Sequence, residues 1–309
     1  MSIIKSISNV FSKKQSSGQL GISLYQHALS FFYFDGNDQQ RYQKIELDRG
    51  NENSHAEILT TLIDKEKLSG TTQLILPVSQ YQIVQIDKPN VPDNEIAAAL
   101  KWQVKELVTF APENMVVDYF DGPVASNGIS RINVVCASKI YLTEIMKSLD
   151  ETNLALKNIS TEEFAFASLL PVEDDATLLV CQQPNEEAIL LIVKQGKLFF
   201  HRRLRGYTQL STQTEEQLSM GSIDSLSLEI QRSTDYFERQ LKHPPIKNIK
   251  VILPVNTENY IVQKLSENTN IPVSLLPLTL GNIKNSEEPS REVACALGAT
   301  QLTQWEHVA

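Results

Sequence analysis

Two strand-rich segments constrain the fold of this 309-residue chain more than any other feature. The first is GISLYQHALSFFYFDG, which predicts two strands, followed by a third strand in RYQKIELDR after the turn at Gly36–Asn37. The second consists of the predicted strands ATLLVCQQ, EAILLIVKQG and KLFFHRRL. Helical segments follow each three-strand meander. Repetition of this kind indicates an α/β protein built from two similar halves.

Between the two meanders, the pattern predicts a compact β-α-β-β-α unit from about Ser79 to Ser148. Its strands are YQIVQIDKP, MVVDYFDG and RINVVCAS, and its last helix is KIYLTEIMKSLDET. A helix in HAEILTTLIDKE and a buried strand in QLILPVSQ precede the unit, and TEEFAFASLL predicts a helix after it.

The first helix of this unit has a clear amphipathic pattern. It is predicted from Asn94 to about Thr109, with Asp93 as its cap after Pro92. Trp102 falls opposite the apolar stripe, so its indole either covers another element or is an exposed contact. The stripe consists of Ile96, Leu100, Val104, Leu107 and Val108.

The second half continues with a long predicted helix from Ile223 to Leu241. The strand IKVILPV, the helix ENYIVQKLSE, the strand VSLL and the final helical segment REVACALGATQL follow it. The long helix packs through a stripe of Ile223, Leu226, Ile230, Phe237 and Leu241.

Composition and charge exclude several classes of protein. The net charge is −9 without a concentrated basic stripe, which argues against wrapping nucleic acid. No apolar run approaches the ~20 residues of a membrane span, and residues 1–19 lack the apolar core of a secretory signal. A cytoplasmic protein is therefore expected. The leader, residues 1–19, is either a short amphipathic segment or a frayed terminus.

Cysteines and histidines give little sign of metal or nucleophilic chemistry. Cys136, Cys181 and Cys295 lie far apart among apolar neighbours without CxxC spacing, so each is predicted to be a small buried residue. The five histidines lack HxxxH and HExxH spacing, so no metal site is expected. The basic cluster from His201 to Arg205 either binds an anion or is a solvated strand end.

The order of these segments resembles the PilM group, the actin-like proteins of type IV pilus assembly, and most closely those of MSHA-type pili. The resemblance covers most of residues 18–302 and is carried by the following stretches: LGISLYQHALSF, LPVSQYQIVQIDKPNVPDNEIAAALKWQVKELVTFAPENMVVDYF, RINVVCASKIYLTEIMKSLDETNLALKNISTEEFAFASL, SLSLEIQRSTDYFERQL and ALGATQL.

The resemblance implies an actin-like, ribonuclease H-like fold with two lobes flanking a nucleotide cleft. It places the first lobe at residues 20–170, with a small β-α subdomain inserted at about 79–148. The second lobe is then at 171–304 and a tail at 305–309.

In nucleotide-binding members of that family, aspartate and glycine residues of two hairpins hold the phosphates. At the matching positions of the first hairpin this chain has Ser23, Tyr25 and Ser30 in place of Asp, Gly and Lys. The carboxylate, the close backbone approach and the cation are lost.

The second hairpin has Cys181 and Gln183 in place of Asp and Gly, followed by Pro184 and two glutamates. Pro254 stands where an adenosine-side glycine is expected, whereas Glu229 is retained in the family pattern EIQRS. No cofactor and no catalytic activity are therefore expected. Retained ATP and Mg²⁺ binding by an actin-like ATPase is the alternative.

The resemblance also implies a partner. Family members bind the short cytoplasmic tail of a PilN-like inner-membrane protein, MshJ in MSHA-type pili, beside the inserted subdomain. In this chain, the strand Tyr81–Asp87 and the helix after it are the expected site. Ile83 and Ile86 alternate in direction, so at most one of them faces the tail, and Trp102 is an exposed anchor candidate. A second alternative is the cytoplasmic adaptor of a type II secretion system.

Overall fold

The computed structural model describes residues 18–35, 39–47, 55–122, 130–278 and 288–302, which form two compact units. Unit 1 contains the described residues up to Gly122, those from Ser130 to Ala165 and those from Cys295 onward. Unit 2 runs from Phe166 to Ala294. The predicted leader lies almost entirely outside the described residues, and the predicted tail lies wholly outside them.

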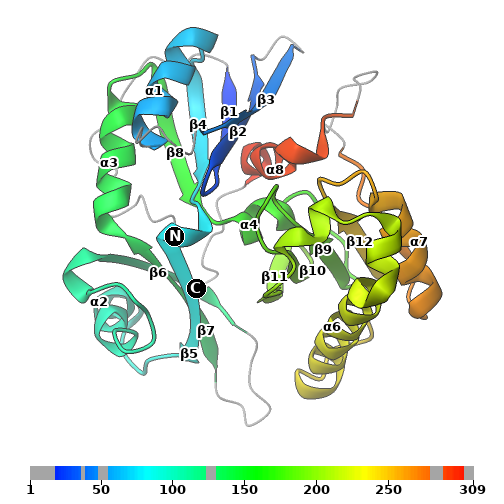
Figure 1. Ribbon diagram of the computed structural model, residues 1–309. Coiled ribbons are helices and arrows are strands. Elements are labelled where there is room, and N and C mark those ends of the chain that lie inside the picture. The colour runs from blue at the N-terminus through cyan, green and yellow to red at the C-terminus, as the bar shows by residue number, and fades with distance from the viewer. Residues whose placement is uncertain (1–17, 36–38, 48–54, 123–129, 279–287, 303–309) are drawn as a thin grey trace. The chain divides into compact units, whose positions relative to one another are not determined.

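Unit 1 is built on a five-stranded sheet in the order β3-β2-β1-β4-β8 (Figure 1). The first three strands form an antiparallel meander, and β4 and β8 continue the sheet in parallel with β1. The strands are β1 (Gln19–Leu24), β2 (Ala28–Phe34), β3 (Gln40–Glu46), β4 (Gly70–Ile75) and β8 (Leu154–Ser160).

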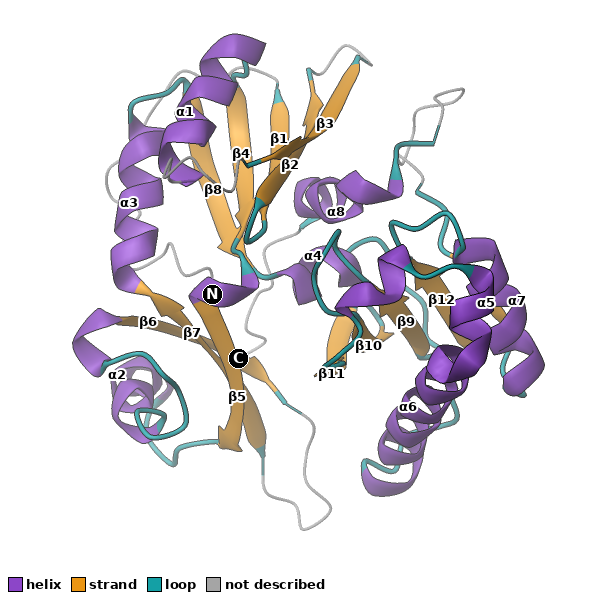
Figure 2. Ribbon diagram, in the orientation of Figure 1, coloured by secondary structure: helices purple, strands orange, loops and turns teal. Residues whose placement is uncertain are grey.

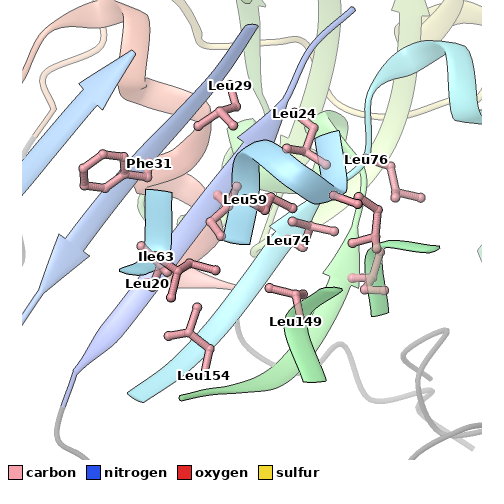
Figure 3. Packing of buried hydrophobic residues seen from close by; sticks show 14 of the residues in the cluster. Leu20, Leu24, Leu29, Phe31, Leu59, Ile63, Leu74, Leu76, Leu149 and Leu154 are labelled. Atoms are coloured by element: carbon pink, nitrogen blue, oxygen red, sulfur yellow. The ribbon is translucent and has the colours of Figure 1, made fainter. Parts of the chain in front are cut away.

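Two helices, α1 (His55–Glu66) and α3 (Lys139–Asp150), pack against one face of this sheet. Alternate residues of β1 point toward them because successive side chains of a strand face opposite sides. The resulting core contains Leu20, Leu24, Leu29, Phe31, Leu59, Ile63, Leu74, Leu76, Leu149 and Leu154, as Figure 3 shows. All ten side chains are buried.

The opposite face of β1 contacts α8 (Ala294–Gln301). A Cβ atom at Gly21 would lie 2.0 Å from the carbonyl oxygen of Ala296, so only glycine permits this approach. The amide of Gln73 on β4 also donates to the carbonyl of Thr300 at 3.4 Å. The family resemblance implies that this helix belongs to the second lobe, residues 171–304, but the structure places it in unit 1.

A smaller antiparallel sheet with the order β5-β7-β6 completes unit 1. It consists of β5 (Tyr81–Asp87), β6 (Met115–Asp121) and β7 (Arg131–Ser138), and α2 (Asp93–Gln103) packs against one of its faces. The buried cluster beneath α2 contains Ile96, Leu100, Val104, Met115, Ile132, Val134 and Cys136.

Two predictions for this subdomain are wrong in detail. The helix ends at Gln103 and not near Thr109, so Leu107 leaves the apolar stripe and is 55% exposed. The compact unit ends at Ser138, whose side-chain oxygen accepts from the backbone N–H of Tyr141 and caps α3. Helix α3 packs on α1 and the large sheet, so it does not belong to the small subdomain.

Unit 2 repeats the five-stranded arrangement in the order β11-β10-β9-β12-β13. Figure 2 labels the first four of these strands. Its strands are β9 (Thr177–Cys181), β10 (Ile189–Lys194), β11 (Lys197–Arg203), β12 (Asn248–Ile252) and β13 (Val273–Leu275). Its helices are α5 (Glu215–Gln217), α6 (Ile223–Asp235) and α7 (Glu258–Asn268), and α4 (Glu162–Ala167) leads from unit 1 into it.

Shorter helical segments continue or precede these elements. The long predicted helix from Ile223 to Leu241 is α6 followed by a π-helical turn, η6 (Tyr236–Gln240). The other segments are η2 (Val78–Gln80), η3 (Pro112–Asn114), η4 (Thr208–Thr212), η5 (Leu218–Ser222) and η7 (Arg291–Val293).

The sequence pattern misses β8. Its residues, LALKNIS, alternate too weakly to predict a strand, and their strand conformation follows from parallel pairing with β4. Within the described residues, no helix is both long and apolar enough to cross a membrane.

The buried stripe of α2 provides a stability test. Replacing Leu100 by Asp places a charge in a fully buried apolar cluster, and we expect the free energy of unfolding to fall by about 3–5 kcal/mol. Ala98→Asp, at an exposed position of the same helix, is the matched control and should cost less than about 1 kcal/mol. Urea unfolding followed by circular dichroism measures both. Equal stabilities of the two variants would contradict the assignment of the buried face.

Candidate functional site

The β1–β2 hairpin contains the three substituted residues of the first predicted phosphate hairpin, Ser23 in β1, Tyr25 in the turn and Ser30 in β2. Ser23, Tyr25 and Ser30 are all buried, and the Tyr25 hydroxyl donates to the Ser30 Oγ. The backbone N–H of Tyr25 also donates to the carbonyl of Ala28 at 2.9 Å. The hairpin is therefore closed by its own polar groups.

His55, at the start of α1, ties this hairpin to the helices. Its Nε2 lies 2.7 Å from the carbonyl oxygen of Tyr25, and its Nδ1 lies 2.9 Å from the hydroxyl of Tyr141 on α3. Burial lowers the pKa of His55. A neutral imidazole satisfies both contacts, donating from Nε2 and accepting at Nδ1.

The second predicted phosphate hairpin joins β9 to β10. Cys181 and Gln183 are buried, and the neighbouring Gln182 donates from Nε2 to the carbonyls of Glu186 at 2.7 Å and Tyr207 at 2.9 Å. Pro184 removes one backbone N–H from the loop. Glu187 accepts from the N–H of Gly206 at 3.1 Å, so the loop is held by side chains of this chain.

Pro254, which matches the adenosine-side position of the family pattern, follows β12. The N–H of Leu253 donates to Glu258 Oε1 at 2.7 Å, and Glu258 pairs with Arg291 at 3.1 Å. Burial raises the pKa of Glu258, while the Leu253 N–H and Arg291 oppose that shift.

Glu229 lies on α6 and contacts two guanidinium groups. Its Oε2 is 3.0 Å from Arg202 on β11, and its Oε1 is 2.7 Å from Arg232 one turn further along α6. The side chain of Glu229 is 16% exposed. Of the stripe predicted for this helix, Ile223, Leu226, Ile230 and Phe237 are buried, and Leu241 packs at the margin of the same core.

No metal centre is evident in the part of the chain that the structure describes, where no three His, Cys, Asp or Glu side chains gather closely enough to hold an ion. The three cysteines are buried, as predicted.

The three residues predicted to bind a partner do not form one cluster. Ile86 belongs to the apolar core under α2, whereas Ile83 packs on the opposite face of the small sheet against the main core of unit 1. Trp102 is 67% exposed on α2. Strand β5 itself is an edge strand of the β5-β7-β6 sheet.

The register of the small sheet places Ile83 beside Val135, and Val135 beside Asp118. Asp118 is thus a carboxyl group on the face that Ile83 occupies. Burial raises the pKa of Asp118 to about 6, although the adjacent N–H of Tyr119, 2.8 Å from Oδ1, favours the charged form. The sequence carried a signal for this residue, because Asp118 lies at the same-face spacing between the apolar Val116 and Phe120 in MVVDYFDG.

Comparison with known proteins rests on structure alone, since no family model and no curated protein sequence matches the chain. A chain of a PilM-PilN type IV pilus biogenesis complex is 14% identical, with a TM-score of 0.67 over 91% of this chain and 97% of that chain. The cytoplasmic domain of EpsL, an inner membrane component of the type II secretion system of Vibrio cholerae, is 11% identical. Its TM-score is 0.52 over 92% of this chain and 94% of that chain.

A third similar structure is a Bacteroides thetaiotaomicron protein with an actin-like ATPase fold and unknown function. It is 12% identical, with a TM-score of 0.50 over 84% of this chain and 91% of that chain. At these identities the comparisons establish fold alone. The chain has an actin-like fold, which confirms the fold class predicted from the sequence.

The raised pKa of Asp118 predicts a pH dependence of stability. The folded pKa lies above the unfolded value of 3.8, so the folded state binds the proton more tightly and loses stability as pH rises from about 4 to 6. Asp118→Asn removes the charge, and we expect it to raise the free energy of unfolding at pH 7.5 by about 1–2 kcal/mol, with little effect at pH 4. Urea unfolding at the two pH values measures this.

Asp121→Asn is the control, at an exposed position of the same strand. A stabilisation by Asp118→Asn that is equal at both pH values, or one that Asp121→Asn reproduces, would refute the assignment.

Proposed function

We propose that the chain is a non-catalytic scaffold of a type IV pilus assembly platform, of the MshI kind found in MSHA-type pili. It would work in the cytoplasm at the inner membrane and bind the cytoplasmic tail of a PilN/MshJ-like membrane protein. The observation that carries this proposal is the likeness to a chain of the PilM-PilN complex, which spans 97% of that chain.

The small sheet of unit 1 offers a suitable docking element for such a tail. An extended peptide can add to the open edge of β5, where main-chain hydrogen bonds supply affinity and side-chain pockets supply specificity. Ile86 packs against the core under α2, whereas Ile83 is partly buried at the margin of the main core on the face that α2 does not cover, so Ile83 is the isoleucine that we expect to contact the tail. A tail rich in Leu or Ile fits this arrangement.

Two features support a scaffold without nucleotide chemistry. The Asp and Gly positions of the family hairpins are Ser23, Tyr25, Cys181 and Gln183. Both hairpins are also closed internally, by the Tyr25–Ser30 bond in one and by the Gln182 amide in the other. A loop whose donors and acceptors pair with each other does not need a phosphate to order it.

Two other functions compete with this proposal. An actin-like ATPase would retain ATP and Mg²⁺ despite the altered hairpins. A type II secretion adaptor is favoured by one observation, the likeness to the cytoplasmic domain of EpsL. Other platform proteins and a second copy of the chain are further partners that the scaffold proposal accommodates.

The nucleotide prediction follows from the lost residues. We expect Mg-ATP to bind no more tightly than about 1 mM, because the carboxylate, glycine and lysine of the first hairpin are absent. Isothermal titration calorimetry with Mg-ATP and Mg-ADP measures this, with an ATP-binding actin-like protein as the positive control. Micromolar affinity for either nucleotide would replace the scaffold proposal by the ATPase alternative.

The partner prediction concerns Trp102. We expect Trp102→Ala to weaken binding of the partner's tail by more than about 1 kcal/mol and to leave the fold intact, because the indole is exposed on α2. The probe is a fluorescein-labelled synthetic peptide of the N-terminal tail of the PilN-like protein from the same organism, titrated by fluorescence anisotropy.

Leu107→Ala is the matched control, since Leu107 is also a large exposed apolar residue that follows α2. Unchanged affinity in a well-folded Trp102→Ala variant removes Trp102 from the site. Failure of the wild-type chain to bind the tail at all overturns the scaffold proposal itself.

A further inference from the structure

One face of α6 and η6 lines a surface hollow together with β11. Arg232, Asp235, Tyr236 and Arg239 occupy positions i, i+3, i+4 and i+7, so they lie along a single helical face. Phe200 and Arg202 contribute from β11. These six residues define the β11–α6 groove, whose volume of about 640 Å³ lies in the range of ligand sites.

The aromatic floor of the groove, formed by Phe200 and Tyr236, lies next to an irregularity in β11. The pairing with β10 shifts at Ile192/Val193, which leaves Phe199 as an extra residue. Phe199 and Phe200 consequently both contact η6: their rings lie 6.3 Å from Phe237 and 5.5 Å from Tyr236, respectively. Phe200 and Tyr236 are therefore held together in the middle of the groove.

Arginines stand at both ends of this floor. At one end the half-buried Glu229 holds Arg202 and Arg232. At the other, Arg239 lies 3.3 Å from Asp235 and its side chain is 79% exposed. A guanidinium has five N–H donors, so one carboxylate leaves donors for a ligand. Glu229 also orders two long side chains before any ligand arrives, which lowers the entropic cost of binding.

The local charge contrasts with that of the whole chain. Three arginines face two carboxylates, Glu229 and Asp235, within and beneath the groove. A net positive site on a chain of net charge −9 selects an anionic ligand by complementarity.

The length of the groove specifies the ligand further. Arg232 and Arg239 are seven residues apart, which corresponds to about 10 Å along the helix axis. A peptide extended in the polyproline II conformation rises about 3.1 Å per residue with three residues per turn, so its residues i and i+3 lie about 9 Å apart on the same side. We propose that the β11–α6 groove is a second docking site, which binds an extended acidic peptide of a partner protein. Two carboxylates at positions i and i+3 contact the arginines, and apolar side chains between them lie on Phe200 and Tyr236.

The spacing makes the proposal testable with synthetic probes. The probes are fluorescein-labelled nine-residue peptides on a valine–glycine background. Their two glutamates stand at positions i and i+1, i and i+3, or i and i+6, and a version of each peptide has glutamine in place of both glutamates. Fluorescence anisotropy at low salt measures their binding to the full chain. We expect the i, i+3 glutamate peptide to bind about fivefold or more tightly than the other spacings, and the glutamine versions to lose binding.

Arg239→Glu should weaken binding of the i, i+3 peptide by about tenfold, because it reverses the charge at one end of the groove. Arg205→Glu is the matched control, an exposed arginine just beyond β11 that does not line the groove, and should change affinity less than about twofold. Circular dichroism melting verifies that both variants fold.

Equal binding of all three spacings, or equal losses in the two variants, would overturn the proposal in favour of non-specific attraction. Full displacement of the peptide by 5 mM inorganic phosphate would also overturn it, since the groove would then be a small-anion site. The partner-tail peptide of the scaffold proposal should bind Arg239→Glu normally, so the two proposals fail independently.

Discussion

The contact between Gly21 and α8 is the constraint on which unit 1 depends. The carbonyl of Ala296 occupies the space of a Cβ atom at Gly21, so the helix lies directly on the backbone of the first strand. That strand is central in its sheet and pairs with β2 on one side and β4 on the other. One face of β1 therefore takes the large side chains of α1 and α3, while the other accepts a helix backbone. The two faces differ because Leu20 and Ile22 point to one side of the strand and Gly21 lies on the other.

Local patterns predicted most of the elements, because period-2 and period-3.6 signals are strong in the two meanders, in α2 and in α6. These patterns failed where packing between residues distant in sequence determines the conformation or the burial of a segment. LALKNIS becomes β8 only through pairing with β4, and Leu107 is exposed because the chain turns after Gln103. The placement of α8 in unit 1 depends on a partner strand about 275 residues earlier, which no local window detects.

Some features of the candidate sites could be predicted from the sequence, whereas others required the structure. Substitutions such as Ser23, Tyr25 and Gln183 were evident because they break a family pattern at fixed positions. The role of those residues in closing their own hairpins was not evident, since it needs the geometry of the turns. The links from His55 to Tyr25 and Tyr141, and from Glu229 to Arg202, join residues far apart in sequence. Charge and residue type alone cannot pair them.

The discontinuity of unit 1 has a consequence for synthesis on the ribosome. Strands β1, β4 and β8 have all been made by Ala165, but α8 begins about 130 residues later, after the whole of unit 2. At ordinary translation speeds this is a delay of roughly 6–26 s. During that interval the waiting face of β1 presents Gln19, Gly21 and Ser23, whereas the Leu20, Ile22 and Leu24 face is covered by helices made before Ala165. The face of β1 that stays exposed until α8 is synthesised is therefore the less hydrophobic of its two faces.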